Sequence, residues 1–321
     1  MTVYAYADVG RTGLGNMLFP WARAEVFRSR HGVGMLAPRW TQPKIGPLLR
    51  GERDLRYYMG LFRSAGYVRG VRRAWVLARG RRVAQEAAEA FMASEASRGG
   101  GTSVVVFKGW EGWFAGLEAH RELVSRRLHE MLSPRVRRML EADDGVTATV
   151  ERGEGRGGGV IAAHVRRGDK RTLPYGAAFA GDAGTTIADE WYIRAIESVR
   201  AALGEAMPVR VYSDAKEGQI DAILRLPGVT RSPDAPSIVD IVRMSRARVL
   251  LTTAGSSFSA WSFYLGAMPT VFYPGTRLDL IPGRPELAVE SDLDGALNAE
   301  AARAVARAAG REKVGRTEGR G

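Results

Sequence analysis

The second half of the chain alternates short apolar segments with longer segments of helical periodicity, and this alternation constrains the fold more than any other feature. Strands that are separated by helices of this length pair in parallel through right-handed crossovers. The pattern therefore predicts a Rossmann-like sheet. The predicted strands cover 160–165, 209–212, 248–253 and 270–273. The predicted helices cover 189–203, 216–226, 236–246 and 256–266.

The first half begins with a similar unit. "VYAYADVG" predicts a strand, a glycine-rich turn follows, and the spacing of apolar residues predicts a helix from Asn16 to Arg30. "SVVVFKGW" predicts a second buried strand, and residues 116–132 predict a helix. The polar, glycine-rich stretch between Asp143 and Gly159 is typical of a linker or a hairpin between domains.

These segments predict an α/β fold with two Rossmann-like domains, which suits a chain of 321 residues. In sheets of this kind, ligands bind beyond the carboxyl ends of the strands. The boundaries that we predict are 1–150 for an N-terminal Rossmann-like domain, 151–298 for a C-terminal Rossmann-like domain, and 299–321 for a helix followed by a disordered tail.

Composition excludes several classes of site. The chain has no cysteine, so disulfides, thiolate metal sites and thiol nucleophiles are excluded. Its four histidines are scattered without metal-ligand spacing, which argues against a zinc enzyme. Nothing in the composition thus calls for a metal or another cofactor. An N-terminus with neither a basic leader nor a small-residue cleavage site, and the absence of an apolar run of 18 residues, predict a cytoplasmic protein without a transmembrane segment.

The formal net charge of +12 and a pI near 10.3 suit an anionic partner such as a nucleotide, a nucleic acid or an acidic membrane surface. Only five of the 47 basic residues are lysines, however, and coding from GC-rich DNA produces the same skew. A basic stretch, predicted to be helical, holds six arginines between Arg69 and Arg82. Peripheral contact with a membrane is compatible with this charge.

The first loop, "GRTGLGN", runs from Gly10 to Asn16. Glycines at positions 10, 13 and 15 allow positive φ angles, and they let backbone amides come close to a phosphate at the start of a helix. A tight turn that needs glycine only for packing would look the same. The loop is not a G-x-G-x-x-G motif with an acidic residue about 20 residues later, which disfavours a nicotinamide site.

The stretch "VIAAHVRRGDK" ends a strand in charged residues. Side chains alternate along a strand, so His164 and Arg166 share one face and Arg167 lies on the other. Arg166 is placed to donate two hydrogen bonds to a diphosphate, while Arg167 can pair with Asp169 and hold the turn that precedes Lys170. A solvated basic turn is the alternative interpretation.

Two further segments place polar groups after strands. Ser256 or Ser257 can cap the helix that begins there, and nearby N–H groups can bind phosphate oxygens. Phe258 and Trp261 are typical of core residues. Asp214 follows a predicted strand, where its carboxylate can accept both the ring N–H and the exocyclic amine of guanine, although a helix N-cap would look identical.

These motifs together resemble the α-1,2-fucosyltransferase family, which is related to the α-1,6- and protein O-fucosyltransferases. "GLGN", "HVRRGDK", "YSD" and "SSFSAWSFYLG" occur in the order found in that family, and the H-x-R-R-G-D hexamer is the specific part. The segment "DEWYIRAIESV" resembles the aromatic-rich helix that follows the arginine loop in bacterial members. The resemblance covers residues 3–31 and 160–275.

The resemblance implies a GT-B architecture, in which two Rossmann-like domains face a cleft, with residues 1–150 as the acceptor-side domain and 151–298 as the GDP-sugar-binding domain. It also implies GDP-fucose as the donor, a hydroxyl of a glycan or glycoconjugate as the acceptor, inversion at the anomeric carbon, and no need for a divalent metal. Arginine and helix amides can supply the electrostatic stabilisation that Mg²⁺ gives elsewhere.

On this chain, the resemblance implies that Arg166 binds the β-phosphate of the donor and that Asp169 braces the arginine loop. Lys170 is the third residue that we assign to the catalytic group. His164 and Asp214 would contact the guanosine. The remaining residues would line the diphosphate pocket and the cleft: Ser256, Ser257 and Phe258 from the C-terminal domain, and Gly13, Gly15 and Asn16 from the N-terminal domain.

The chain also departs from the family. Met17 stands where many bacterial members have glutamine, and "KRTLPYG" holds no acid of the kind that the long α-1,6 enzymes place beyond the lysine. The general base that would deprotonate the acceptor is therefore unassigned. Its weak candidates are Asp8, Asp182, Asp189 and Glu190.

Three alternatives stay open at this stage. The first is a transferase of the same fold that uses another GDP-sugar. The second is a basic nucleic-acid-binding protein, which is disfavoured because no known motif is present and no exposed aromatics are expected among the arginines. The third is a GDP-sugar-binding protein without catalytic activity.

Overall fold

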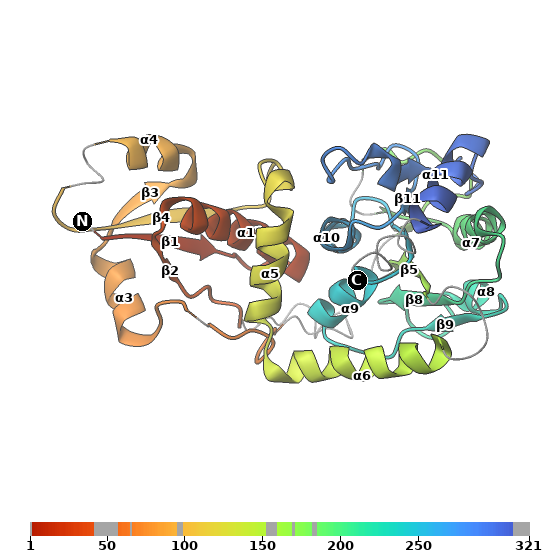
Figure 1. The fold of residues 1–321 in the computed structure, drawn as a ribbon, viewed down its shortest axis with the longest axis horizontal. Helices are drawn as coiled ribbons and strands as arrows, with labels where there is room; N and C mark the ends of the chain where they lie inside the picture. The colour runs from red at the N-terminus through yellow and green to blue at the C-terminus, as the bar shows by residue number, and fades with distance from the viewer. Residues whose placement is uncertain are drawn as a thin grey trace, which may run out of the picture. The chain divides into compact units, whose positions relative to one another are not determined.

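The computed structural model describes residues 2–41, 57–64, 66–94, 99–151, 159–168, 171–181 and 185–310, with side chains of the helix around residue 140 described as far as Ala142. Contacts divide the chain into two compact units. Unit 1 comprises Met1–Ile45 and Asp54–Arg137, and unit 2 comprises Gly46–Arg53 and Arg138–Gly321. Each unit is built on a parallel sheet (Figure 1).

Unit 1 holds a four-stranded sheet in the order β2-β1-β4-β3, and every pairing in it is parallel. Its strands are β1 (Thr2–Asp8), β2 (Gly34–Leu36), β3 (Arg81–Ala84) and β4 (Thr102–Lys108). Its helices are α1 (Leu14–His31), α3 (Gly70–Arg79), α4 (Ala88–Ala93) and α5 (Arg121–Met131), with short 3₁₀ turns η1 (Gln85–Ala87) and η3 (Glu118–His120).

The long helix α1 confirms the strand, turn and helix predicted for the N-terminus. It begins at Leu14, two residues earlier than predicted, and it ends at a glycine, Gly32, in the left-handed conformation. Its buried carboxylate, Glu25, accepts hydrogen bonds from Arg28 and from Arg127 of α5, at 3.2 and 3.1 Å, and from the hydroxyl of Tyr67. These charge-assisted bonds compensate for the burial of the Glu25 carboxylate.

Unit 2 holds a six-stranded parallel sheet in the order β12-β11-β10-β5-β8-β9. Its strands are β5 (Ile161–Val165), β8 (Val209–Ser213), β9 (Val229–Arg231), β10 (Val249–Leu251), β11 (Thr270–Phe272) and β12 (Ala288–Glu290), beside a separate pair, β6 (Arg171–Thr172) and β7 (Thr185–Thr186). Its helices are α7 (Asp189–Leu203), α8 (Asp221–Leu224), α9 (Ser237–Met244), α10 (Ser257–Gly266) and α11 (Ala299–Gly310), with a 3₁₀ turn η4 (Pro285–Leu287).

The order of these six strands is that of a Rossmann fold. The chain runs outward from β5 through β8 to β9, then returns to the other side of β5 and runs outward again through β10, β11 and β12. The direction of winding therefore reverses between β5 and β10, next to each other in the sheet. Such a switch point is where open α/β sheets bind ligands, at the carboxyl ends of the strands.

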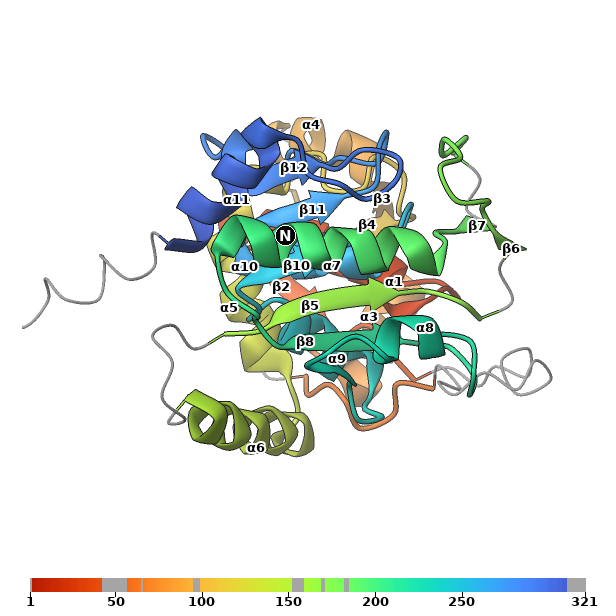
Figure 2. The same ribbon diagram turned by 90° about the vertical axis from the view of Figure 1, so that its right-hand side faces the viewer.

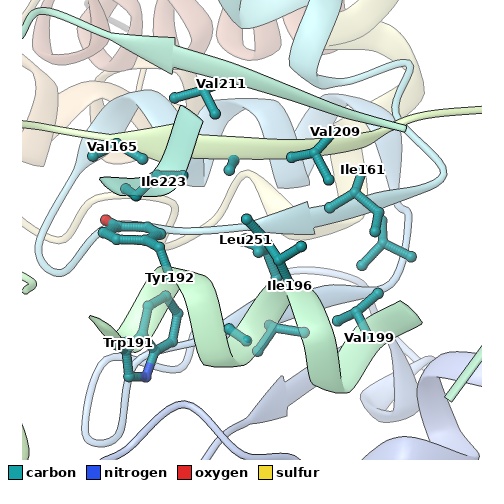
Figure 3. Packing of buried hydrophobic residues seen from close by; sticks show 14 of the residues in the cluster. Ile161, Val165, Trp191, Tyr192, Ile196, Val199, Val209, Val211, Ile223 and Leu251 are labelled. Atoms are coloured by element: carbon teal, nitrogen blue, oxygen red, sulfur yellow. The ribbon is translucent and has the colours of Figure 1, made fainter. Parts of the chain in front are cut away.

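Helices α7, α8 and α11 lie on one face of this sheet, and α9 and α10 lie on the other (Figures 1 and 2). The core on the first face is formed where Trp191, Tyr192 and Ile196 of α7 pack on strand residues such as Val165 and Leu251 (Figure 3). All five residues of β5 are buried. The central strand is thus covered on both sides, which explains its continuous apolar sequence.

Most predicted elements of the second half are confirmed, with some differences. Helix α7 has the predicted bounds of 189–203, whereas α8 is a single turn, Asp221–Leu224, instead of a helix over 216–226. The prediction of a linker from residue 143 is wrong in part, because α6 (Pro134–Glu151) continues through it. The two units divide within α6, between Arg137 and Arg138, whereas the sequence suggested residue 150.

The predicted terminal helix is observed as α11, which packs against α7, and the tail that we predicted beyond it lies outside the described residues. In the described part of the chain, no helix has both the length and the apolar character that crossing a membrane requires.

Candidate functional site

Three loops meet at the switch point of the unit 2 sheet. They follow the carboxyl ends of β5, β8 and β10, neighbours in the sheet, and they hold most of the residues singled out in the sequence. Arg166 to Gly168 follow β5, Asp214 follows β8, and residues 252–256 lead from β10 into α10. The geometry of these loops defines the candidate site.

His164 connects β5 to α10. Its Nδ1 lies 2.6 Å from the hydroxyl oxygen of Ser259, a residue of α10, and its ring stacks on Phe258 with centroids 5.9 Å apart. Burial, and then the positive charge of Arg166, lower the pKa of His164 to about 3. The imidazole is therefore neutral at physiological pH, and it acts as a fixed hydrogen-bonding group rather than a proton donor.

The two arginines of the loop have different environments. The guanidinium of Arg167 is buried and donates to the carbonyl oxygen of Ile187 at 2.9 Å, to the hydroxyl of Thr186 at 3.3 Å, and to the carboxylate of Asp189. It also lies 5.9 Å from the centre of the Tyr192 ring. Arg167 is thus committed to holding the loop against α7.

Arg166 is half-buried, and no described residue accepts a hydrogen bond from its guanidinium. Its charge acts on His164, which lies on the same side of the strand, as strand alternation predicts. A cation that is held near the end of the central strand and has no protein acceptor among the described residues is free to bind an anion.

Asp214 fixes the turn that follows these arginines. Its Oδ1 accepts a hydrogen bond from the backbone N–H of Arg167 at 2.6 Å. Gly168 adopts a positive φ of 46°, and a Cβ built on it would lie 2.9 Å from Oδ2 of Asp214. Any larger residue at position 168 would therefore strain the backbone and collide with this carboxylate, which explains the glycine of the motif.

The loop has bracing contacts that the sequence did not indicate: the Arg167 guanidinium binds Asp189, and its backbone N–H donates to Asp214. The pairing of Arg167 with Asp169 stays a prediction. Asp169 and Lys170 lie outside the described residues. The contact of Asp214 with guanosine stays a prediction, and this carboxylate has a structural role as well. The side chain of Asp189 is engaged by Arg167, which weakens it as a candidate general base.

At the start of α10, the structure distinguishes the two serines that could cap the helix. Ser256 is the N-cap, and its side-chain oxygen accepts a hydrogen bond from the N–H of Phe258 at 3.3 Å, while Ser257 is the first helical residue. The predicted core position of Trp261 is confirmed, but Phe258 is only half-buried, against His164. The assignment of these residues to a diphosphate pocket stays a prediction.

In unit 1, the predicted phosphate loop, residues 10–16, forms the turn between β1 and α1. Gly10 has a positive φ of 61°, but Gly13 has a φ of −66° and is the N-cap of α1, while Gly15 and Asn16 lie in the first turn of that helix. Two N–H groups of this turn, those of Asn16 and Met17, bond to the carbonyl oxygen of Gly13. Positive φ is therefore wrong as the reason for glycine at 13 and 15.

Sequence reasoning missed three residues that shape the unit 2 site. Ser259 orients His164, and Thr186 and Tyr192 enclose Arg167 and the β5 backbone, where the Tyr192 hydroxyl donates to the His164 carbonyl oxygen at 3.0 Å. Tyr192 belongs to the aromatic-rich segment already noted, which could have indicated it. Nothing in the local pattern distinguishes Ser259 from a helix residue that only packs. Of the base candidates, Glu190 and Asp8 are exposed, and Asp182 lies outside the described residues.

No family model matches this chain, and no curated protein matches it in sequence. Solved structures with a similar fold include POFUT1 in complex with GDP-fucose, with 10% identity over 84% of this chain and 98% of that one, at a TM-score of 0.50. Others are the fucosyltransferase NodZ from Bradyrhizobium, with 16% identity over 88% and 96% at 0.48, and FUT1 of Arabidopsis thaliana with GDP, with 10% identity over 85% and 70% at 0.46. The predicted α/β, GT-B-like fold is confirmed.

Proposed function

We propose that this protein is a glycosyltransferase that moves fucose from GDP-fucose to a hydroxyl group of a glycan or glycoconjugate. The observation that carries the proposal is the guanidinium of Arg166, which has no acceptor among the described residues and lies at the switch point of a Rossmann-like sheet, beside a capped helix N-terminus. The similar structure of POFUT1 contains GDP-fucose, and the H-x-R-R-G-D hexamer favours the α-1,2-fucosyltransferase branch of such enzymes.

The reaction would proceed with inversion. The acceptor oxygen attacks the anomeric carbon of fucose from the face opposite the diphosphate, the bond from this carbon to the phosphate oxygen breaks, and GDP leaves with additional negative charge. Arg166 would donate hydrogen bonds to that charge, together with N–H groups near the start of α10, and its effect would be greatest in the transition state. The proton of the acceptor hydroxyl passes to a base that the sequence leaves unassigned.

Rigidity of the loop supports this role for Arg166. Its neighbour Arg167 is fixed by Ile187, Thr186 and Asp189, and the Arg167 N–H is fixed by Asp214. Because these bonds hold the backbone next to Arg166, the origin of its side chain is placed before the donor binds, and electrostatic catalysis depends on such preorganisation. The proposed reaction needs no metal ion, because these cationic and backbone donors can neutralise the charge of a diphosphate.

The experiment that tests the proposal has two readouts. Thermal shift with GDP, UDP, ADP and NAD should show stabilisation by GDP alone, because a ligand that binds only the folded state raises the melting temperature. Release of GDP from GDP-fucose in the presence of glycan acceptors, with and without EDTA, should then show turnover that the chelator does not reduce.

Four results would count against the proposal in different ways. Stabilisation by GDP without turnover on any acceptor would favour a non-catalytic binding protein. Faster turnover with another GDP-sugar would change the donor but keep the reaction, and EDTA sensitivity would overturn metal independence. No response to GDP at all would overturn the proposal as a whole.

A further inference from the structure

Helix α3 of unit 1 presents an apolar face to solvent. Val71 and Trp75, one helical turn apart, are 87% and 55% exposed, and Ala74 and Ala78 beside them are exposed as well. The opposite side of the helix is already used, since Val76 is buried against β1 and β4. The exposed side therefore is not needed for the core of the unit. It also contradicts the expectation that no exposed aromatic lies among the arginines.

Arginines flank this apolar face. Arg72 and Arg79 lie beside it on α3, and both are exposed. Exposed Arg82 of β3 pairs with Val104, the β4 residue that packs against α3, whereas Arg81 lies over the Phe91 ring of α4. Residues 55–85 contain eight arginines and no aspartate or glutamate. A segment of this length without a single acid is strongly positive, and it is complementary to an anionic surface rather than to another basic face.

The helix is held firmly in place, so the face is displayed by a rigid element. The guanidinium of Arg73, on the inner flank, donates to the carbonyl oxygen of Ala37 at 2.7 Å and to the hydroxyl of Tyr6 at 3.3 Å. Arg72 donates to the hydroxyl of Tyr4 at 3.0 Å. These two arginines anchor α3 to the sheet, which leaves Arg79 and Arg82 beside the apolar residues.

We propose that this surface, defined as Val71, Trp75, Ala74 and Ala78 of α3 with Arg79 and Arg82 beside them, binds the surface of an anionic lipid bilayer. The apolar side chains would enter the boundary between headgroups and acyl chains, where tryptophan is favoured, and the guanidinium groups would remain at the level of the lipid phosphates. The α3 helix is labelled in Figure 1. The inference does not depend on the proposed function.

A lipid surface fits these residues better than a nucleic acid does. A single-stranded nucleic acid would use a series of aromatic rings for stacking along a basic groove. Here Trp75 is the one exposed aromatic of α3, and its neighbour on the same face is the aliphatic Val71, the more exposed of the two. Aliphatic side chains gain from burial in acyl chains but offer no stacking surface to a base.

The test is flotation of the full-length protein with two kinds of vesicle. One kind is phosphatidylcholine alone, and the other is phosphatidylcholine with roughly 30% of the anionic lipid phosphatidylglycerol. We expect binding to the anionic vesicles at least about tenfold tighter than to the neutral ones, weakening as salt is raised. The double variant Val71→Ser with Trp75→Ser should lose most of this binding, because both side chains face solvent and contribute to no core.

Control variants distinguish binding through this surface from non-specific binding of the protein to vesicles. Trp110→Ala removes another exposed tryptophan of unit 1, outside α3, and should leave vesicle binding unchanged. Arg79→Ser with Arg82→Ser should weaken binding to anionic vesicles and leave circular dichroism and the melting temperature as in the unaltered protein. A single-stranded oligonucleotide serves as the competing anionic ligand.

The proposal is overturned if the protein does not float with anionic vesicles at low salt, or if the double variant at 71 and 75 binds them as tightly as the unaltered protein does. It is also overturned if the oligonucleotide binds through the same residues and displaces the vesicles, since the surface would then be a nucleic-acid site. Concentration-dependent dimerisation that the double variant abolishes would identify a second copy of the chain as the occupant instead.

Discussion

Two adjacent arginines of one loop, Arg166 and Arg167, have different hydrogen-bonding environments in this protein. The side chain of Arg167 points into unit 2, where Thr186, Ile187 and Asp189 accept its hydrogen bonds, whereas Arg166 has no such acceptor among the described residues. Strand alternation at the end of β5 separates them to opposite sides. One of them can therefore serve a ligand while the other serves the fold.

The first prediction uses this pair. Arg166→Ala should reduce turnover with GDP-fucose by about a hundredfold or more, because it removes a donor aimed at the developing charge, and should leave the free energy of unfolding nearly unchanged. Arg167→Ala should instead lower the free energy of unfolding by about 3 kcal/mol, because it leaves a partly buried carboxylate without its partner. Steady-state kinetics and urea denaturation measure the two effects. Equal losses of stability in both variants would contradict the division of roles.

His164 gives a prediction for pH. Its pKa is about 3 in the folded protein and near 6.5 when unfolded. Below pH 6.5 the unfolded chain binds a proton that the folded protein does not, so stability falls as pH decreases from 6.5 towards 3 and is unaffected by this group above 6.5. From pH 7 to pH 5 the loss due to this residue should be about 2 kcal/mol.

The variant His164→Asn isolates this contribution. Asparagine can still form a hydrogen bond with Ser259 but does not titrate, so the difference in free energy of unfolding between pH 7 and pH 5 should shrink relative to the unaltered protein. Urea midpoints at the two pH values measure it. An unchanged difference would mean that His164 is not the buried titrating group, and that other residues cause the loss in acid.

At the scale of elements, helix α10 links the polar loop after β10 to the core. Its N-cap side chain, Ser256, is buried and bonds to the N–H of Phe258, while Ser257 is half-exposed and has no capping role. Ser256→Ala should lower the free energy of unfolding by about 1 kcal/mol, the usual value for loss of a serine cap. Ser257→Ala is the matched control and should cost less than about half as much, because alanine is favourable inside a helix. Urea denaturation of both variants decides; an equal loss would refute the assignment of the cap.

The helices and strands also show which elements the local sequence pattern could predict and which it could not. The helix Asp189–Leu203 was predictable because one face is apolar over four turns and a glycine, Gly204, ends it. The three-residue strands β9 and β12 were not predicted, because Val229–Arg231 holds one apolar residue and Ala288–Glu290 ends in an acid. The equally short β10 and β11 were predicted because they are more apolar. The polar stretch from residue 143 was misread because glycine and acidic residues weaken a helix without excluding it, and α6 extends into it.

At the scale of the whole molecule, each unit has its own parallel sheet, and the candidate donor site lies on the unit 2 sheet. Hydrogen exchange with saturating GDP should therefore slow most strongly in peptides that cover 161–168 and 251–260, because a bound ligand suppresses local opening there. Peptides of β3 and α4 are the internal control and should exchange at an unchanged rate. Protection confined to the control peptides would place the nucleotide site elsewhere.

The same measurement examines the N-terminal loop. The resemblance assigns Gly13, Gly15 and Asn16 to the cleft, so a smaller protection over 10–17 is expected on binding of GDP. Its absence would leave the loop as the packed start of α1, with glycine at 13 and 15 explained by something other than a nucleotide.

The sequence by itself determined the α/β class, the parallel sheets and the polar segments that follow the central strands. It could do so because hydrophobic periodicity and the position of charge relative to a strand are local properties. It also predicts Arg166 as the residue that would bind a diphosphate, because strand alternation places it at the end of a buried strand on the face of His164.

Only the tertiary structure decided which groups are engaged. That Arg167 binds Asp189 and Asp214, that Ser259 orients His164, and that the solvent side of α3 is apolar all depend on contacts between segments 20 to 95 residues apart, or on which helix face the sheet covers. No periodicity encodes such contacts, because they form only when the strands have paired and the helices have packed.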